Sequence, residues 1–78
     1  MGLAKDERAA AAAGKGCLGK AADEEPVFVL RAQDSLAADT VDHWANHARL
    51  LGVHPDKVRE AHELADAMRA WPIQKVPD

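Results

Sequence analysis

The sequence lacks several features that small proteins use to stabilise a fold. It has one cysteine, so no disulfide can form within the chain, and it has no tyrosine and a single phenylalanine. Alanine accounts for 17 of the 78 residues, which leaves few large apolar side chains for a core. Below roughly 70–80 residues a single core rarely contributes more than about 3–5 kcal/mol, and such domains often rely on partner chains. We therefore expect one small domain that forms a homo-oligomer, with a dimer favoured, or that docks on a larger partner.

Long apolar runs and an excess of positive charge are also absent. No stretch approaches the roughly 18 apolar residues of a membrane span, and the alanines before Gly14 are too weakly apolar for a signal peptide. We expect a cytoplasmic protein without membrane contact. The net charge is −3, whereas nucleic-acid binders usually carry a basic face, so nucleic acid is the less favoured partner.

Composition divides the chain into an N-terminal arm and a domain. Residues 1–25 are rich in Ala, Gly and Lys and end in an acidic run. The stretch 5–13 favours a helix, and the glycines after it would end that helix. We interpret residues 1–25 as a flexible arm that orders on a partner, and residues 26–78 as a small domain.

The domain is predicted to be α+β and mostly α, with one short strand followed by an αα-hairpin (β-α-α). The strand is expected at Val27–Leu30, because these four apolar residues follow Pro26 and include β-branched and aromatic side chains. The lack of alternation indicates burial on both faces. A lone strand cannot satisfy its backbone N–H and C=O groups, so we expect it to pair with residues 73–76 or with a second chain.

Two amphipathic helices should follow the strand. The first is expected to begin after Asp34 or Ser35 and to end at Gly52, and the second to open at Pro55 and close at Pro72. Their apolar stripes contain Leu36, Ala37, Val41, Trp44, Ala45, Ala48 and Leu51, then Val58, Ala61, Leu64, Ala65, Met68 and Trp71. The short link predicts an antiparallel hairpin, with both tryptophans as core anchors.

The segment GKGCLGKA at positions 14–21 is one residue from a phosphate-binding loop. The pattern requires Ser or Thr where Ala21 stands, and it requires a preceding strand. An alanine-rich stretch precedes it instead, and acidic residues follow. We interpret the segment as a linker and expect no cofactor, with an oligomeric nucleotide-binding protein kept as an alternative. Cys17 lies between two lysines, but a mobile segment orients a nucleophile poorly.

Metal and catalytic sites find little support in the spacing. His43 and His47 are four residues apart on one predicted helix, a spacing that can chelate a metal, but no third ligand accompanies them. No Ser-His-Asp arrangement or carboxylate pair can be argued from these positions. We expect neither a metal site nor an enzyme.

The hairpin also allows a DNA-binding interpretation. Residues 45–64 resemble the helix-turn-helix of bacterial regulators, with a small residue four positions before Gly52 and apolar residues around the turn. In that alternative Lys57 and Arg59 would contact DNA from the second helix. The neighbouring carboxylates oppose phosphate binding.

Most of the chain resembles a set of small, mostly uncharacterised phage and prophage proteins. The resemblance covers residues 25–78. It is carried by EPVFVLRAQD at 25–34, then by Val41, Trp44-Ala45, Lys57-Val58, Ala61, Ala65, Met68, Trp71, Lys75, Pro77 and Asp78. It implies a protein that binds a host or anti-phage defence protein and inhibits it. Arg31, Gln33 and Asp34, which follow the predicted strand, are the candidate contact residues.

Overall fold

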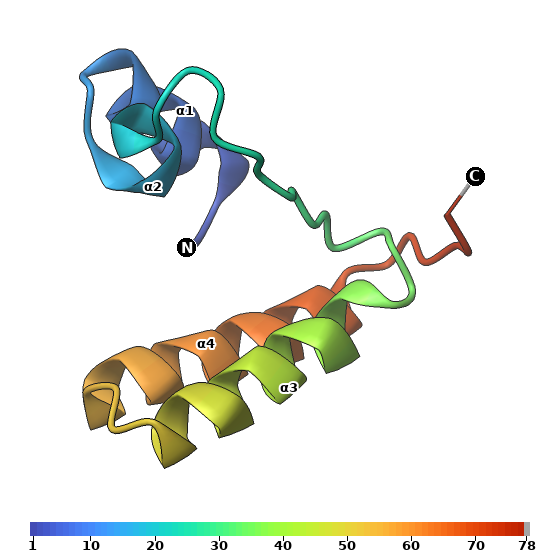
Figure 1. Cartoon of the computed structure of the whole chain (residues 1–78). Helices are drawn as coiled ribbons and strands as arrows, with labels where there is room; N and C mark the ends of the chain where they lie inside the picture. Colours follow the sequence, from blue (N-terminus) through green and yellow to red (C-terminus); the bar gives the residue numbers. More distant parts are fainter. Residues whose placement is uncertain (78) are drawn as a thin grey trace.

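A computed structural model describes residues 1–77, which form four helices arranged as two pairs (Figure 1). The helices are α1 (Ala4–Ala12), α2 (Gly16–Lys20), α3 (Ala37–Leu50) and α4 (Pro55–Ala70). Helix α1 contacts α2 and helix α3 contacts α4, while neither of these described pairs contacts the other. No helix in this part of the chain has both the length and the apolar character needed to cross a bilayer.

Helices α3 and α4 form the predicted αα-hairpin, and local signals set their ends. The side chain of Asp34 accepts a hydrogen bond from the backbone N–H of Leu36 (2.8 Å), just before α3 begins. Gly52 follows the end of α3 with φ +83°, a left-handed conformation that glycine adopts without a Cβ clash. His54 caps α4 by accepting from the Asp56 N–H (3.1 Å), and Pro55 occupies the first helical position.

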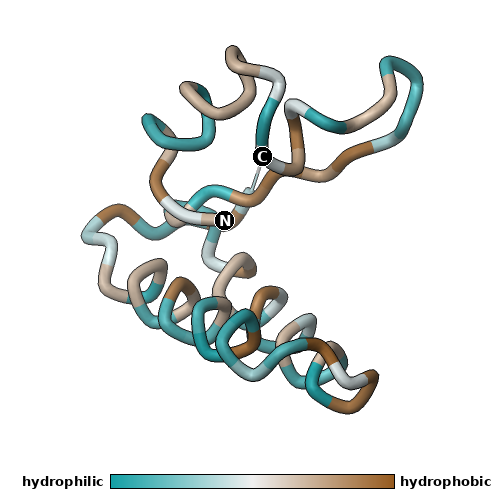
Figure 2. Tube along the Cα trace, turned by 90° about the vertical axis from the view of Figure 1, so that its left-hand side faces the viewer, coloured by the Kyte–Doolittle hydropathy of each residue, from teal (hydrophilic) through white to brown (hydrophobic). Residues whose placement is uncertain are grey.

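Alanine dominates the contact between α3 and α4. The buried residues of the described chain are Ala37, Ala38, Ala45, Ala48, Val58, Ala61 and Ala65. Such small side chains let the two helix backbones approach closely. Figure 2 shows that hydrophilic and hydrophobic residues alternate along both helices, as expected for amphipathic helices. Larger members of the predicted stripes lie beside this contact line. Trp44 and Trp71 remain 47% and 50% exposed, so the expectation that both are core anchors is wrong.

The predicted β-α-α fold is wrong, because residues 1–77 contain no strand and no sheet. Val27–Leu30 run as a linker between α2 and α3 without hydrogen bonds from their backbone in the described structure. The C-terminal tail does approach the linker, but its pairing with it as a strand is limited to one isolated parallel bridge between Asp34 and Lys75. A strand requires a continuous partner backbone, and the alanine core is too thin to cover an apolar strand. The apolar composition of this segment therefore does not make it a strand.

The N-terminal arm holds the compact pair α1 and α2. The turn between them passes through Gly14, whose φ is +71°. Gly19 lies against this turn, and a Cβ added there would come within 2.9 Å of the backbone carbonyl carbon of Gly14. The arm therefore uses glycine where two backbone segments touch. Helix α1 spans Ala4–Ala12, whereas the sequence predicted a helix over residues 5–13.

Candidate interaction site

The linker and the C-terminal tail meet in front of α3. The backbone N–H of Lys75 donates to the carbonyl of Gln33 (2.8 Å), and the N–H of Ser35 donates to the carbonyl of Lys75 (2.9 Å). The N–H of Asp34 donates to the carbonyl of Arg31 (3.0 Å), which turns the chain toward the helix. These bonds hold two segments that lie about forty residues apart in sequence beside one another.

Gln74 fastens this junction to the end of α4. The Nε2 of its side-chain amide shares its two N–H groups among the carbonyls of Ala32 (3.0 Å), Met68 (2.9 Å) and Trp71 (3.1 Å). The carbonyls at a helix C-terminus have no partner within the helix, so a side chain that reaches them both caps the helix and anchors the tail. One residue thus connects the linker, the tail and α4.

A groove of about 270 Å³ opens at this junction. Its lining consists of Val29, Arg31, Gln33, Asp34, Lys75 and Pro77. The three residues predicted from the sequence as contact residues therefore lie together in one groove. Arg31 contributes a cationic side chain to this lining and Asp34 an acidic one.

The predicted contact residues differ in whether their side chains already make hydrogen bonds within the chain. Asp34 already uses its carboxylate to accept the Leu36 N–H, and its backbone takes part in the bridge to the tail. Arg31 is exposed, and its side chain has no hydrogen bond or ion pair within residues 1–77. Arg31 is therefore available for a partner, whereas Asp34 shapes the groove.

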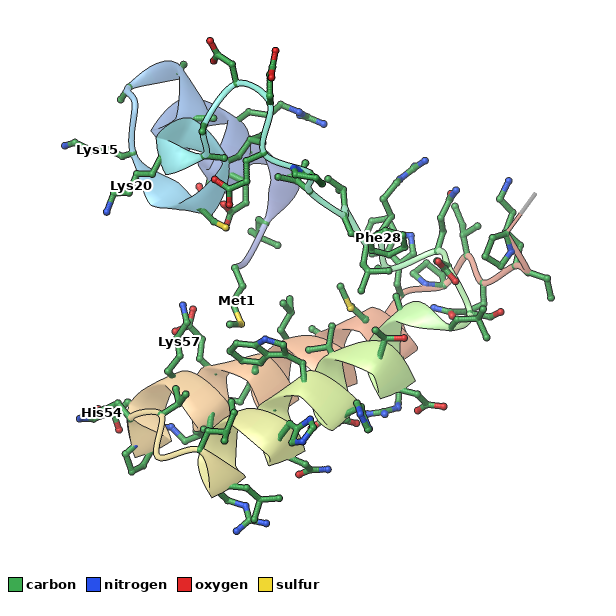
Figure 3. All side chains as sticks on the ribbon, viewed as in Figure 1. Met1, Lys15, Lys20, Phe28, His54 and Lys57 are labelled. Atoms are coloured by element: carbon green, nitrogen blue, oxygen red, sulfur yellow. The ribbon has the colours of Figure 1, made fainter. Side chains whose placement is uncertain are left out.

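The apolar segment next to the groove is solvent-exposed. Phe28, on the linker between the two helix pairs, is 84% exposed, and Val29 is 73% exposed (Figure 3). Val27 is also exposed. Isolated surface apolar residues are ordinary, but three in succession, including the only phenylalanine, form a contiguous apolar segment.

A network of charged side chains joins α3 and α4 on one side of the hairpin. Asp42 accepts from the Nδ1 of His62 (2.7 Å) and pairs with Arg69, which also contacts Asp39 (2.9 Å) and Asp66 (3.2 Å). Hydrogen bonds from Arg69 and then His62 lower the pKa of Asp42. The same bonds, from Asp42 first and then Asp39, raise the pKa of Arg69. These bonds connect Asp39 and Asp42 on α3 with His62 and Arg69 on α4.

The residues of the DNA-binding alternative lie apart from one another. Lys57 projects toward the arm side of the hairpin (Figure 3). Arg59 pairs with Asp56 (3.1 Å) and Glu63 (3.6 Å), which compete with phosphate for its guanidinium. Helices α3 and α4 lie side by side along their length, whereas a helix-turn-helix sets its helices at a steep angle.

The two histidines whose spacing could chelate a metal, His43 and His47, lie on α3. The His43 and His47 rings pack edge to face, with centroids 5.7 Å apart. Within residues 1–77 no group of three or more His, Cys, Asp or Glu side chains could hold a metal ion.

The GKGCLGKA segment folds as a turn and the short helix α2. It follows helix α1 rather than a strand, and Ala21 ends α2 instead of continuing a helix beyond a phosphate loop. Lys15 and Lys20 point away from the rest of the molecule (Figure 3), and Cys17 is exposed with a free thiol. This arrangement differs from the strand–loop–helix context that phosphate binding requires.

Sequence reasoning missed Lys75 and Pro77 as groove residues and Gln74 as their anchor. The sequence did indicate that residues 73–76 could pair with the segment Val27–Leu30. Such a backbone pairing does not predict which side chains lie together in the groove. The Asp42–His62 pair had no detectable signal, since its members are twenty residues apart on separate helices.

In comparisons with known proteins, no family model, no curated protein and no solved structure matches the chain.

Proposed function

We propose that this chain is a small non-enzymatic binding protein that acts through protein–protein interaction, with the segment Val27–Val29 and the adjacent groove as its contact surface. The observation that carries the proposal is the 84% exposure of Phe28. Large aromatic side chains that enter a pocket on the partner are the most frequent energetic anchors of protein interfaces. Proline before the segment reduces the conformational entropy that binding would cost.

The side chains around Phe28 indicate the chemistry of the partner surface. An apolar pocket would receive Phe28, with Val27 and Val29 at its edges. Arg31, in the lining of the groove, would face carboxylates at the rim of that pocket, because planar guanidinium groups bind carboxylates in a bidentate manner. The partner is therefore a protein with an apolar pocket beside acidic residues. The resemblance to phage proteins supports a bacterial target that the binding inhibits.

Affinity capture with matched variants tests this proposal. The wild-type chain, Phe28→Asp and Leu50→Asp are used as baits in bacterial lysate. Leu50 is a suitable control because it is also exposed but lies on α3, away from the groove. A true partner is retained by the wild type and by Leu50→Asp and is lost with Phe28→Asp.

Purified proteins then give the affinity. Truncating an aromatic anchor costs about 2 kcal/mol or more, so Phe28→Ala should weaken binding at least about 30-fold in calorimetry. Arg31→Glu should weaken binding as well, through charge repulsion with the acidic rim. Equal retention of every captured protein by Phe28→Asp and by the wild type would refute the proposal.

A further inference from the structure

The α3–α4 hairpin has two unlike faces, one on each side of the line where the helices touch. This contact line passes through Ala45 on α3 and Ala61 on α4. Asp42 and His62 are bonded to each other across the two helices, so both lie on the same side of the line. That face of the hairpin is polar, and its ion pairs link the two helices.

Large apolar side chains lie on the opposite face. Successive residues of an α-helix are rotated by about 100°, so Trp44, directly before Ala45, lies on the side away from the ion pairs. Leu64, three residues after Ala61, lies on the same side, and Met68 continues the stripe four residues later. Leu64 and Met68 are half-buried, whereas Trp44 is 47% exposed. We call Trp44, Leu64 and Met68 the tryptophan face.

The tryptophan face looks toward the N-terminal arm of the same chain. Lys57, which lies on this side of α4, projects toward the arm, and Met1 projects from the arm toward the hairpin (Figure 3). Figures 1 and 2 both place the N-terminus on the side of the arm nearest the hairpin. Helices α1 and α2 make no contact with α3 or α4 in the described chain. The arm thus faces the tryptophan face without packing its helices on it.

The end of the arm nearest the hairpin carries apolar groups and one acid. The side chain of Met1 is 19% exposed, and its ammonium group pairs with Oε1 of Glu7 (3.0 Å), so the Glu7 carboxylate lies at this end. No hydrogen bond or ion pair within residues 1–77 uses the second oxygen, Oε2. Leu3, which lies between these two residues in the chain, is exposed. This end of the arm therefore offers a thioether, a leucine and one carboxylate oxygen.

The hairpin offers groups that match this end of the arm. Lys57 makes no hydrogen bond or ion pair within residues 1–77, so its ammonium group is available to Oε2 of Glu7. The exposed indole of Trp44 can receive the thioether of Met1, because methionine sulfur packs favourably against aromatic rings. The two surfaces are therefore complementary in charge and in apolar character.

We propose that the N-terminal arm is a lid that closes on the tryptophan face. In the closed state Met1 and Leu3 pack against Trp44. Glu7 pairs with Lys57 at the edge of this contact. Closure covers the indole, whereas opening exposes it to a partner.

The linker between α2 and α3 allows this movement. Residues 21–36 contain no helix or strand, and the backbone of Val27–Leu30 makes no hydrogen bond in the described chain. A linker without such bonds can change its direction at little cost. Both halves of the contact belong to one chain, so closure is independent of protein concentration. The lid does not depend on the Phe28 surface.

The chain contains its own reporters of closure. Cys17 on α2 is its one cysteine and has an exposed thiol, and the indole N–H of Trp44 marks the tryptophan face. A nitroxide is attached to Cys17 of the full ¹⁵N-labelled chain, and the broadening of the Trp44 indole signal is measured by NMR. We expect strong broadening, and its absence would overturn the proposal. Broadening that requires mixing with nitroxide-labelled unenriched chains would assign the lid to a second chain and would also overturn it.

Charge reversal tests the ion pair. Lys57→Glu should lower the ratio of closed to open chains about two- to fivefold, the effect of an exposed ion pair, and should weaken the broadening accordingly. Glu7→Lys should do the same, and the two substitutions together should restore the wild-type broadening. Lys15→Glu makes the same change on a side chain that points away from the rest of the molecule, so it should leave the broadening unchanged.

Circular dichroism establishes that each variant retains its helices. Lys57→Glu lies outside the arm, so it tests the lid even if Glu7→Lys unfolds α1. Equal broadening in the wild type and in Lys57→Glu would refute the lid. A double variant that stays as open as the single variants would refute the pairing of Glu7 with Lys57.

Discussion

Enlarging Ala61 should destabilise the hairpin more than any surface change on the same helix. Ala61 is 0% exposed and packs with Ala45, Ala48 and Val58 along the contact line between α3 and α4. Replacing it with leucine adds three carbon atoms. If space were available, their burial would contribute about 2.4 kcal/mol, at roughly 0.8 kcal/mol per methylene.

The structure offers no such space. Two of the three neighbours are alanines, which have no side-chain torsion to adjust, so the added carbons must move the helix backbones apart. Overpacking of a well-packed core typically costs about 1–3 kcal/mol. Helix propensity does not offset this cost, because leucine and alanine are both good helix formers. We therefore expect Ala61→Leu to reduce the free energy of unfolding by about 1–3 kcal/mol.

Urea unfolding followed by far-ultraviolet circular dichroism measures this change. All variants are compared at one protein concentration, because association would add to the apparent stability. Ala67→Leu is the matched control: the same substitution at an exposed position of α4 should change stability by no more than about 0.5 kcal/mol. If Ala61→Leu proved as stable as Ala67→Leu, the alanine contact line would not be the close-packed core described above.

Two further substitutions test the charged network around Asp42 and the packing of the N-terminal arm. The bonds from Arg69 and His62 lower the pKa of Asp42 in the folded state, so its stabilising contribution is present above the unfolded value of about 3.9 and is lost as the pH falls through the lower folded value. Asp42→Asn should therefore lower stability at neutral pH and flatten its decline below about pH 4, and stability curves parallel to those of the wild type would contradict this. In the arm, Gly19→Ala places a Cβ 2.9 Å from the Gly14 carbonyl carbon, so α2 must separate from α1. The variant should show faster hydrogen exchange in residues 4–20 than the wild type, and equal protection would refute the close packing.

The hairpin was predictable from sequence because helices form from local hydrogen bonds. Gly52 and Pro55 mark the turn, and the apolar spacing identifies which alanines lie on the contact line. The same spacing did not show that the helices would approach closely enough to exclude the indoles. Trp44 lies one residue before Ala45, and that step of 100° places it beside the contact line.

The sequence by itself determined the two amphipathic helices, their turn and the apolar character of Val27–Val29. It did not determine that this segment would remain unpaired, because a strand depends on a distant backbone and the tail offers only the bridge between Asp34 and Lys75. Tertiary structure also decided which residues share a site. Arg31, Gln33 and Asp34 were candidates from their positions in the chain, but the groove exists because Gln74 anchors the tail beside them. Helices arise from neighbours in sequence, whereas grooves and exposed faces arise from segments that only folding brings together.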